Sequence, residues 1–545
     1  MERAIGLEAV TTAILLAIAF SVPRSGARWF RRAEGLLGRL AHRRLSIALV
    51  GLAAFMGSAA VSLLVRTPQP MVHDEFSYLL AADTFASGRL TNPTHPMWMH
   101  FESFHIIHQP TYASKYPPGQ GLVLAAGQAL GGHPIVGVWL GMGLAGAALT
   151  WMLQAWVPPW WALVGGLLAV VRLGPFGYWS QSYWGGAVAA IGGALVLGGL
   201  RRITRRPQVR QAVLMGLGLA ILANTRPYEG LLMSLAAAAV LLVWMIGRTG
   251  PTARVAMTHI VLPTLVVLTL TGCAMGFYNV RVTGDPLRMP YQVHEERYSV
   301  APIFTWQSPR AVPAYRHKVL HAFHMINLAS YLERDSFSGL ARVKIREFAR
   351  LWTFYLGPAL TVPLVMLPWV LKERWMRVAL LIGGVVAAGL GVEVFAWPHY
   401  AAPITGLVFV LVVQAMRRLR LWRWRDRPTG RSIVWAILLL SVLLASQVRS
   451  EPWALSLQRA RILEALKDDD NRHLVIVRYR PWHSPHFEWV YNAADIDAAK
   501  VVWAREMGEA LDRRLLEYFK DRVAWLLEAD ATPPRLTRYT PGSDL

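Results

Sequence analysis

A polar stretch from Arg66 to Pro118 carries residue types that suit acid–base chemistry. Its first feature is the tripeptide His73-Asp74-Glu75. Two adjacent carboxylates can divide labour, because one can accept a proton from a nucleophile while the other orients the site or holds a cation. One carboxylate of the Asp74-Glu75 pair is therefore a candidate general base, and the other is its candidate helper. A competing interpretation is that Asp74 caps a helix that begins here, since Asp is a favoured N-cap residue.

The same stretch ends near Lys115 and Tyr116, which precede a Pro-Pro-Gly turn and a short apolar run. A lysine in this place suits a phosphate at headgroup depth. It also fits an ordinary lysine whose ammonium extends to the membrane surface. His73 and Asp83 are further candidates for contacts with a substrate.

Histidines in the stretch suggest a metal as a second possibility. His105 and His108 are three residues apart with Glu102 nearby, a set that could ligate zinc, and Glu75 is a further candidate ligand. No complete ligand set with diagnostic spacing is visible. A divalent cation is thus the one cofactor that the sequence suggests. The sequence does not specify which metal ion this would be.

Later polar segments add residue types that bind anions and sugars. Arg226 lies in a turn between two apolar runs and can bind an anion in a bidentate manner. An ion pair between Arg226 and Glu229 that only fixes the turn is the alternative. Four more candidates for contacts with a sugar lie in later loops, which also fit ordinary connecting segments: Tyr291, His294, His399 and Tyr400.

Membrane helices are the elements that must position these residues. Of the 545 residues, 54% are hydrophobic and 16% are charged, and the mean hydropathy is +0.33. This composition is typical of polytopic membrane proteins rather than of soluble domains. The one cysteine, Cys273, lies inside an apolar run, so neither an intrachain disulfide nor a Cys-based zinc site is possible.

The net charge of +23 is concentrated in a few places. Five short segments between apolar runs hold 24 of the 56 Lys and Arg residues and only 3 of the 33 Asp and Glu residues: 23–44, 201–210, 248–254, 372–377 and 417–431. Such a bias is typical of cytoplasmic loops, with some contact to anionic membrane lipids. Nucleic acid is therefore not an expected partner.

Apolar runs predict twelve membrane-spanning helices. They lie at residues 4–22, 45–65, 134–155, 160–174, 185–200, 211–223, 230–247, 255–278, 349–370, 377–395, 401–416 and 431–447. Several are shorter than the roughly 20 residues that a perpendicular span prefers. Residues 4–22 lack the positively charged start and the cleavage site of a signal peptide, so we expect this helix to be retained.

The basic segments also predict the orientation of the chain. The apolar run 119–131 is short, and if it lies flat on the outer surface, all five basic segments fall inside together. The stretch 66–118, the loop 279–348 and the C-terminal tail then share the outer face. We expect a multi-pass protein of the plasma (inner) membrane, with these loops and the C-terminus outside.

The predicted fold is an all-α polytopic membrane protein with a small outer α/β domain at its C-terminus. Its expected parts are a membrane domain over 1–447, with outer loops 66–133 and 279–348, and the outer domain over 448–545. Within the latter, residues 474–479 alternate like a strand and residues 498–527 show a helical pattern. Five residues near the strand end could contact a sugar, but packing is their commoner role: Trp482, His483, His486, Glu488 and Trp489.

In their order and on their shared face, these motifs resemble the GT-C superfamily of membrane glycosyltransferases. The similarity is strongest to the bacterial branch with the protein O-mannosyltransferases, the lipid A aminoarabinose transferase and the rhizobial lipopolysaccharide galacturonosyltransferases. Three elements carry it: the acidic motif at Asp74, the segment AADTFASGRL with Asp83 and Gly88, and KYPPG from Lys115. The resemblance covers roughly residues 45–420. The first helix, the C-terminal domain, Arg226 and His399 match no motif of that family.

The resemblance implies transfer of a sugar from a polyprenyl-phosphate carrier to a lipid, glycan or protein acceptor at the outer face, with inversion at the anomeric carbon. Asp74 would then deprotonate the acceptor hydroxyl, and Glu75 would position it or bind a cation. Lys115 and Arg226 would stabilise the departing lipid phosphate, because fixed cations stabilise developing negative charge best in a poorly hydrated site.

Two other classes of function remain open at this stage. A transporter or lipid flippase would place charges near the bilayer midplane and show repeat symmetry, whereas here the charged residues gather at the outer ends of helices. An envelope assembly protein whose outer loops bind partners is the other alternative.

Overall fold

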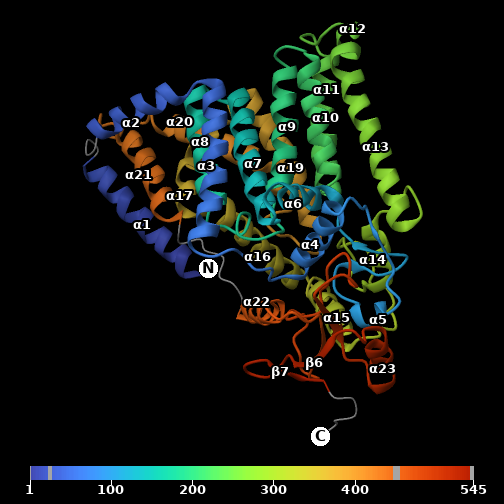
Figure 1. The fold of residues 1–545 in the computed structure, drawn as a ribbon. Helices are drawn as coiled ribbons and strands as arrows, with labels where there is room; N and C mark the ends of the chain where they lie inside the picture. The colour runs from blue at the N-terminus through green and yellow to red at the C-terminus, as the bar shows by residue number, and fades with distance from the viewer. Residues whose placement is uncertain (1, 23–26, 446–453, 540–545) are drawn as a thin grey trace.

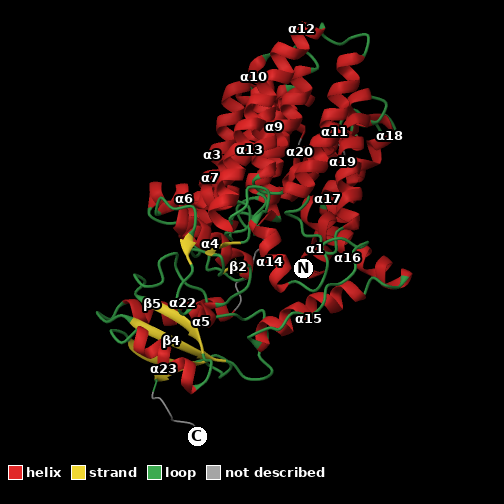
Figure 2. Ribbon diagram, turned by 90° about the vertical axis from the view of Figure 1, so that its right-hand side faces the viewer, coloured by secondary structure: helices red, strands yellow, loops and turns green. Residues whose placement is uncertain are grey.

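The structure is a computed structural model that describes residues 2–22, 27–445 and 454–539. Long helices form a bundle at one end of the molecule, and a small sheet with short helices forms the other end (Figure 1). Figure 2 shows the same division from the side, with the strands gathered below the bundle. The chain thus forms the predicted helical membrane body with a small domain that contains a sheet.

The bundle consists of helices from both halves of the chain. They are α1 (Glu2–Ser21), α2 (Ala27–Leu40), α3 (Arg43–Leu64), α7 (Ile135–Trp156), α8 (Pro159–Leu173), α9 (Ala187–Ile203), α10 (Val209–Ala223), α11 (Pro227–Ile246), α12 (Ala253–Ala256), η1 (Met257–Val261), α13 (Leu262–Thr283), α16 (Phe337–Tyr355), α17 (Gly357–Thr361), η2 (Val362–Met366), α18 (Leu367–Val370), α19 (Arg374–Val392), η3 (Ala402–Ile404), α20 (Thr405–Leu419) and α21 (Thr429–Leu443).

The remaining elements lie at or below one end of the bundle. They are α4 (His73–Ala86), β1 (Asn92–Pro93), α5 (Trp98–Phe101), β2 (Ile106–Ile107), β3 (Thr111–Ser114), α6 (Pro118–Gly131), α14 (Pro290–Tyr298), α15 (Lys318–Leu332), α22 (Ala454–Lys467), β4 (His473–Arg478), β5 (Val501–Arg505), α23 (Glu509–Tyr518), β6 (Val523–Glu528) and β7 (Arg535–Arg538).

Each of the twelve predicted runs falls on helical structure among the described residues; residues 446–447 of the last run lie outside them. Among the described residues, six helices are long and apolar enough to cross a membrane, or seven if one bent pair counts as a span. Four shorter apolar helices accompany them: Ile5–Ser21, Pro159–Leu173, Val209–Ala223 and Thr429–Leu443. The protein is therefore a multi-pass membrane protein, and the number twelve stays a prediction.

Close contact between α3 and α7 holds the centre of the bundle. A Cβ on Gly143 would lie 3.2 Å from the Gly51 carbonyl oxygen, and one on Gly51 would lie 3.1 Å from the Gly143 carbonyl oxygen. Small residues let membrane helices approach this closely, since lipid supplies no hydrophobic drive for their association. The two glycines thus set the spacing of the helices that lead into and away from the polar end.

The span predicted at 349–370 is not one straight helix, because the chain bends by 88° at the break between Phe337–Tyr355 and Gly357–Val370. Gly357 at the bend has a φ of +61°, and a Cβ there would lie 2.7 Å from Glu8 Oε1. Glu8 pairs with Arg172 at 3.2 Å and accepts a hydrogen bond from the Ala359 N–H at 3.2 Å. This buried ion pair from α1 and α8 therefore fills the angle of the bend.

The C-terminal domain is built on a four-stranded sheet in the order β5-β4-β6-β7. β4 pairs in parallel with β5 and β6, and β7 is antiparallel to β6. The strand predicted at 474–479 is confirmed. The continuous helix predicted at 498–527 is wrong, because β5, α23 and β6 occupy this range. Buried parallel strands are short apolar runs, which periodicity cannot distinguish from buried helix.

The polar elements that were predicted to lie outside gather at one end of the molecule. α4, α5, α14 and α15 lie there with the C-terminal domain, whereas α2 and α12 lie at the opposite end of the bundle (Figure 1). The apolar run 119–131 forms the 14-residue α6, which packs against α4 and α7. Its flat position on the membrane surface stays a prediction.

Two single-cysteine variants test the orientation in a background where Cys273 is replaced by Ala. Trp482 is 73% exposed in the C-terminal domain and Leu421 is 72% exposed at the opposite end. We expect a membrane-impermeant maleimide to label Trp482→Cys in intact cells and Leu421→Cys only after permeabilisation. The reverse pattern would invert the predicted topology.

Candidate active site

At the start of helix α4, the side chain of Glu75, and not that of Asp74, accepts hydrogen bonds from the backbone N–H groups. The N–H groups of Met71 and Val72 donate to Glu75 Oε2 at 2.7 and 3.1 Å, and the Tyr183 N–H donates to Glu75 Oε1 at 2.9 Å. Val72 is the N-cap residue, in an extended conformation. The alternative that Asp74 caps this helix is therefore wrong. Asp74 is left with its carboxylate available for other contacts.

Burial dominates the protonation of Glu75. The side chain is fully buried, and burial raises its pKa to about 7, although the three N–H donors favour the charged form and lower the pKa. Both oxygens are already used within the protein. Glu75 thus joins the first turn of α4 to the segment around Tyr183, a structural contact that fixes where Asp74 lies.

The carboxylate of Asp74 is held by Tyr116 and remains partly open to solvent. The Tyr116 hydroxyl donates a hydrogen bond to Asp74 Oδ1, and Asp74 Oδ2 lies 4.0 Å from His105 Nε2. Burial and the Asp74 charge raise the pKa of Tyr116, so its hydroxyl keeps the proton. The Tyr116 ring stacks on Tyr78 with 4.6 Å between ring centres. Because 25% of the Asp74 side chain is exposed, a substrate hydroxyl can reach it.

Lys115 already has a partner inside the protein. Its ammonium lies 3.2 Å from Glu295 Oε1 and 4.9 Å from the centre of the Tyr291 ring. Although burial alone would raise the pKa of Glu295, the charge of Lys115 holds it below the ordinary value. His294 Nδ1 lies 3.5 Å from the same oxygen, and burial lowers the pKa of His294 to about 4, so this ring is neutral at neutral pH. The ion pair with Glu295 therefore weakens the attraction between the Lys115 ammonium and a phosphate.

Arg226 is the least saturated cation of the predicted site. Its guanidinium lies 4.3 Å from the centre of the Tyr400 ring, and its nearest carboxylate oxygen, on Glu229, is 3.9 Å away. It occupies the N-cap position of α11. A helix N-terminus and a guanidinium both favour a bound anion. The loose ion pair with Glu229 leaves most of the guanidinium donors for such an anion.

The charges of Asp74 and Arg226 act on some of the same tyrosine side chains. Burial lowers the pKa of Arg226, but Glu229 and the nearby Tyr78, Tyr400 and Tyr116 raise it more. Burial raises the pKa of Tyr400, and the charge of Asp74 adds to that increase. The candidate base and the candidate anion-binding residue therefore border the same cluster of rings.

Asp83 and His73 lie on α4 but contact the C-terminal domain. Asp83 Oδ2 accepts a hydrogen bond from the Ala494 N–H at 2.7 Å. His73 Nδ1 lies 2.6 Å from the Tyr491 hydroxyl, and burial lowers the pKa of His73 to about 3. These two residues attach α4 to the domain and are not brought to Arg226.

His108 and His399 also lie apart from Asp74. The ring of His108 packs on Tyr112, with 5.3 Å between ring centres. His399 Nδ1 lies 3.2 Å from the Tyr178 hydroxyl. His399 nevertheless immediately precedes Tyr400, so it supports the turn that carries this ring.

A metal site built from protein ligands alone is not found in the part of the chain that the structure describes, where no group of three or more His, Cys, Asp or Glu residues could hold an ion. Asp74 and His105 form a pair only. The oxygens of Glu75 are occupied by backbone N–H groups, and His108 lies elsewhere. The predicted ligands thus do not fit a metal as a set.

Several important residues were missed by sequence reasoning. Glu295 pairs with Lys115, and Tyr78 stacks on Tyr116. The only sequence signal for Glu295 was an acid next to the candidate His294. Tyr491 gave no signal, since its contact with His73 joins residues 418 positions apart.

Packing, rather than sugar contact, explains Glu488 and Trp489. Glu488 forms a buried ion pair with Arg505 at 2.7 Å, and Trp489 is fully buried. Arg505 also donates to the Glu102 carbonyl oxygen at 2.8 Å. The predicted alternative of a packing role is confirmed for these two residues.

No protein-family model matches the chain, and no curated protein matches it significantly. Solved structures do match. ArnT from Cupriavidus metallidurans bound to undecaprenyl phosphate has a TM-score of 0.46 and 13% identity, over 91% of this chain and 96% of that one. The Archaeoglobus fulgidus oligosaccharyltransferase in complex with Zn and sulfate has a TM-score of 0.47 and 12% identity, over 88% of this chain and 67% of that one.

A third match is the oligosaccharyltransferase AglB from Archaeoglobus fulgidus in complex with an inhibitory peptide and a dolichol-phosphate. Its TM-score is 0.41 and its identity is 10%, over 88% of this chain and 69% of that one. The roles of individual residues follow from the geometry of the site.

The buried carboxyl of Glu75 predicts a pH-dependent stability. A folded-state pKa of about 7 against 4.5 means that the folded protein binds the proton more tightly. The contribution of Glu75 to stability is therefore fully present below pH 4.5 and is lost as the pH rises through 7, by about 3 kcal/mol. We expect the melting temperature in detergent to fall more between pH 5 and 7.5 for the wild type than for Glu75→Gln. Equal falls would show that Glu75 does not titrate in this range.

Proposed function

We propose that this protein is a membrane glycosyltransferase. It moves a sugar from a polyprenyl-phosphate carrier to a cell-envelope acceptor, which is a lipid, a polysaccharide or a protein. The reaction takes place at the outer face of the plasma membrane and inverts the anomeric carbon. One observation carries the proposal: a partly exposed carboxylate, Asp74, and a weakly paired guanidinium, Arg226, border the same cluster of tyrosine rings.

Asp74 acts as the general base in this proposal. The acceptor hydroxyl gives its proton to Asp74, and its oxygen forms a bond to the anomeric carbon of the donor sugar. The bond between that carbon and the phosphate oxygen breaks, and its electron pair stays on the phosphate. Tyr116 keeps the carboxylate oriented through its hydrogen bond. Glu75 contributes by fixing α4.

Arg226 stabilises the departing phosphate. Its guanidinium is fixed on Tyr400 at the N-terminus of α11, so little reorganisation is needed when negative charge develops. Lys115 stabilises the phosphate less than Arg226 does, because its ion pair with Glu295 already balances its charge. The Tyr291 ring lies beside the ammonium of Lys115. A divalent cation, if required, would need ligands from the substrate beside Asp74.

Asp74→Asn tests the role of the base. Asn keeps the shape and can accept the hydrogen bond from Tyr116, but it cannot take up a proton. We expect turnover to fall by about 10² to 10⁴ with little change in donor binding. Asp285→Asn is the matched control on an exposed loop and should keep wild-type turnover. Near-normal transfer by Asp74→Asn would rule out this residue as the base.

Arg226→Gln tests the phosphate site. Hydrogen bonds between charged partners contribute about 1.5 to 3 kcal/mol, so binding of undecaprenyl phosphate should weaken by roughly 10- to 100-fold. Lys115→Met should weaken it less, because that lysine is already paired. Arg288→Gln, in an exposed ion pair with Glu296, is the control. Unchanged binding in Arg226→Gln would make the residue structural.

A transfer assay in proteoliposomes tests the function as a whole. Radiolabelled polyprenyl-phosphate sugars would be scanned as donors, with extracted envelope lipids, glycans and proteins as acceptors. Movement of a labelled lipid across the bilayer without sugar transfer would favour a flippase instead.

A further inference from the structure

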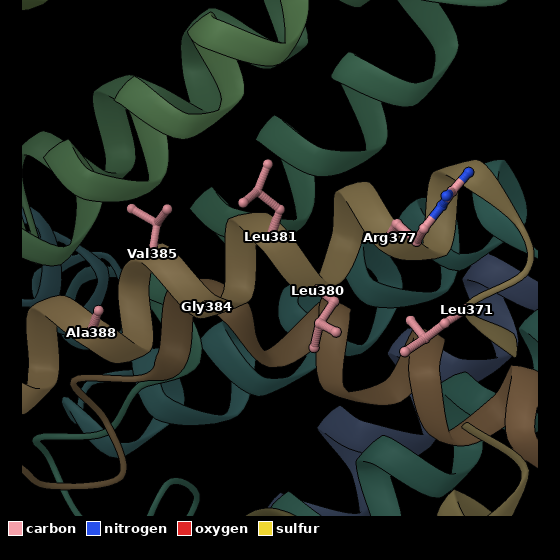
Figure 3. A pocket seen from close by; sticks show the side chains of 7 residues that line it. All are labelled: Leu371, Arg377, Leu380, Leu381, Gly384, Val385 and Ala388. Atoms are coloured by element: carbon pink, nitrogen blue, oxygen red, sulfur yellow. The ribbon is translucent and has the colours of Figure 1, made fainter. Parts of the chain in front are cut away.

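A hollow lies along one side of α19, in the half of the bundle that is distant from the candidate active site. It has a volume of about 580 Å³ and is lined by Leu371, Arg377, Leu380, Leu381, Gly384, Val385 and Ala388. Figure 3 shows Arg377 at one end, followed by Leu380, Leu381, Val385 and Ala388 along the helix. Leu381 is 61% exposed, although it lies inside a membrane span. The hollow therefore opens to lipid.

The length of the hollow matches one leaflet of a bilayer. From Arg377 to Ala388 the helix rises about 16 Å, at 1.5 Å per residue. This is about half of the 30 Å thickness of the hydrocarbon core. Arg377 lies in the first turn of the span, at headgroup depth, and the other end of α19 leads to the turn with Tyr400. The hollow thus belongs to the leaflet opposite the candidate active site.

The charges at the mouth of the hollow favour an anion. Arg377 lines the hollow, and Lys372 and Arg374 lie in the same six-residue segment of the chain. No ion pair joins any of these three residues to an acid among the described residues. The nearby Glu373 already forms an ion pair with Arg418, with 2.5 Å between Glu373 Oε1 and Arg418 Nη2. The hollow is apolar along its length and has an unpaired cation at the end that lies at the membrane surface. These two properties match the acyl chain and the charged headgroup of one anionic phospholipid.

We propose that this hollow is a binding site for an anionic phospholipid of that leaflet. The lipid phosphate lies on Arg377, and one acyl chain follows Leu380, Leu381, Gly384 and Val385. The polyprenyl-phosphate carrier does not fit this description, because its phosphate would lie at the opposite membrane surface. The site is therefore independent of the transfer reaction.

Photolabelling tests the site. The full-length protein in nanodiscs would be exposed to phosphatidylglycerol or phosphatidylcholine with a photoreactive acyl chain, and the labelled peptides mapped by mass spectrometry. We expect phosphatidylglycerol to label residues 380–388 several-fold more than phosphatidylcholine does. Arg377→Gln should lower the phosphatidylglycerol yield by about fivefold, the effect of one basic residue at an anionic surface.

Filling the hollow provides the second variant. A Cβ on Gly384 meets no atom within 4 Å, so Gly384→Leu places a side chain in the hollow without a clash and should remove most of the labelling. Gly272→Leu on α13 also meets open space and is the matched control. Arg254→Gln is the control for charge.

Three results would overturn the proposal, and the first needs no variant. They are equal labelling by the two phospholipids in the wild type, unchanged labelling in Gly384→Leu, and displacement of phosphatidylglycerol by an equimolar amount of undecaprenyl phosphate. The last result would assign the hollow to a polyprenyl lipid.

Discussion

A buried carboxylate determines where the candidate active site can form. Glu75 accepts hydrogen bonds from two N–H groups of its own turn and from the Tyr183 N–H, so it locks the start of α4 to a distant segment. An unpaired buried donor or acceptor costs about 1 to 3 kcal/mol. With these groups satisfied by Glu75, the neighbouring Asp74 can face the tyrosine cluster.

Most other charges near the site are neutralised within the protein. Lys115 pairs with Glu295, and Arg505 pairs with Glu488. A buried charge without a partner is costly, so such pairs are expected at buried positions. Asp74 and Arg226 differ because each keeps capacity for a further partner. This contrast distinguishes residues suited to chemistry from residues that hold the fold.

The C-terminal domain packs directly against α4, the helix that carries Asp74. Leu80 of α4 packs in one hydrophobic cluster with Leu474 and Ile476 of β4. Polar contacts at Asp83 and His73 reinforce this attachment at both ends of α4. The domain therefore restricts the motion of the helix that carries Asp74, although none of its described residues, 454–539, is found in contact with Arg226.

The sequence by itself determined the features that depend on local composition. Apolar runs located the helices, the distribution of Arg and Lys predicted the shared face of the polar loops, and alternation located the strand at 474–479. The acidic motif and Arg226 also stood out, because such residues are rare in membrane helices without a role.

Only the tertiary structure decided which charges are free and which are paired. Glu75 meets the Tyr183 N–H across 108 residues, Lys115 meets Glu295 across 180, and the bend at Gly357 depends on Glu8 from the first helix. Two neighbouring carboxylates such as Asp74 and Glu75 look equivalent in a sequence. They acquire different roles because burial and hydrogen bonding depend on segments that meet only in the folded chain.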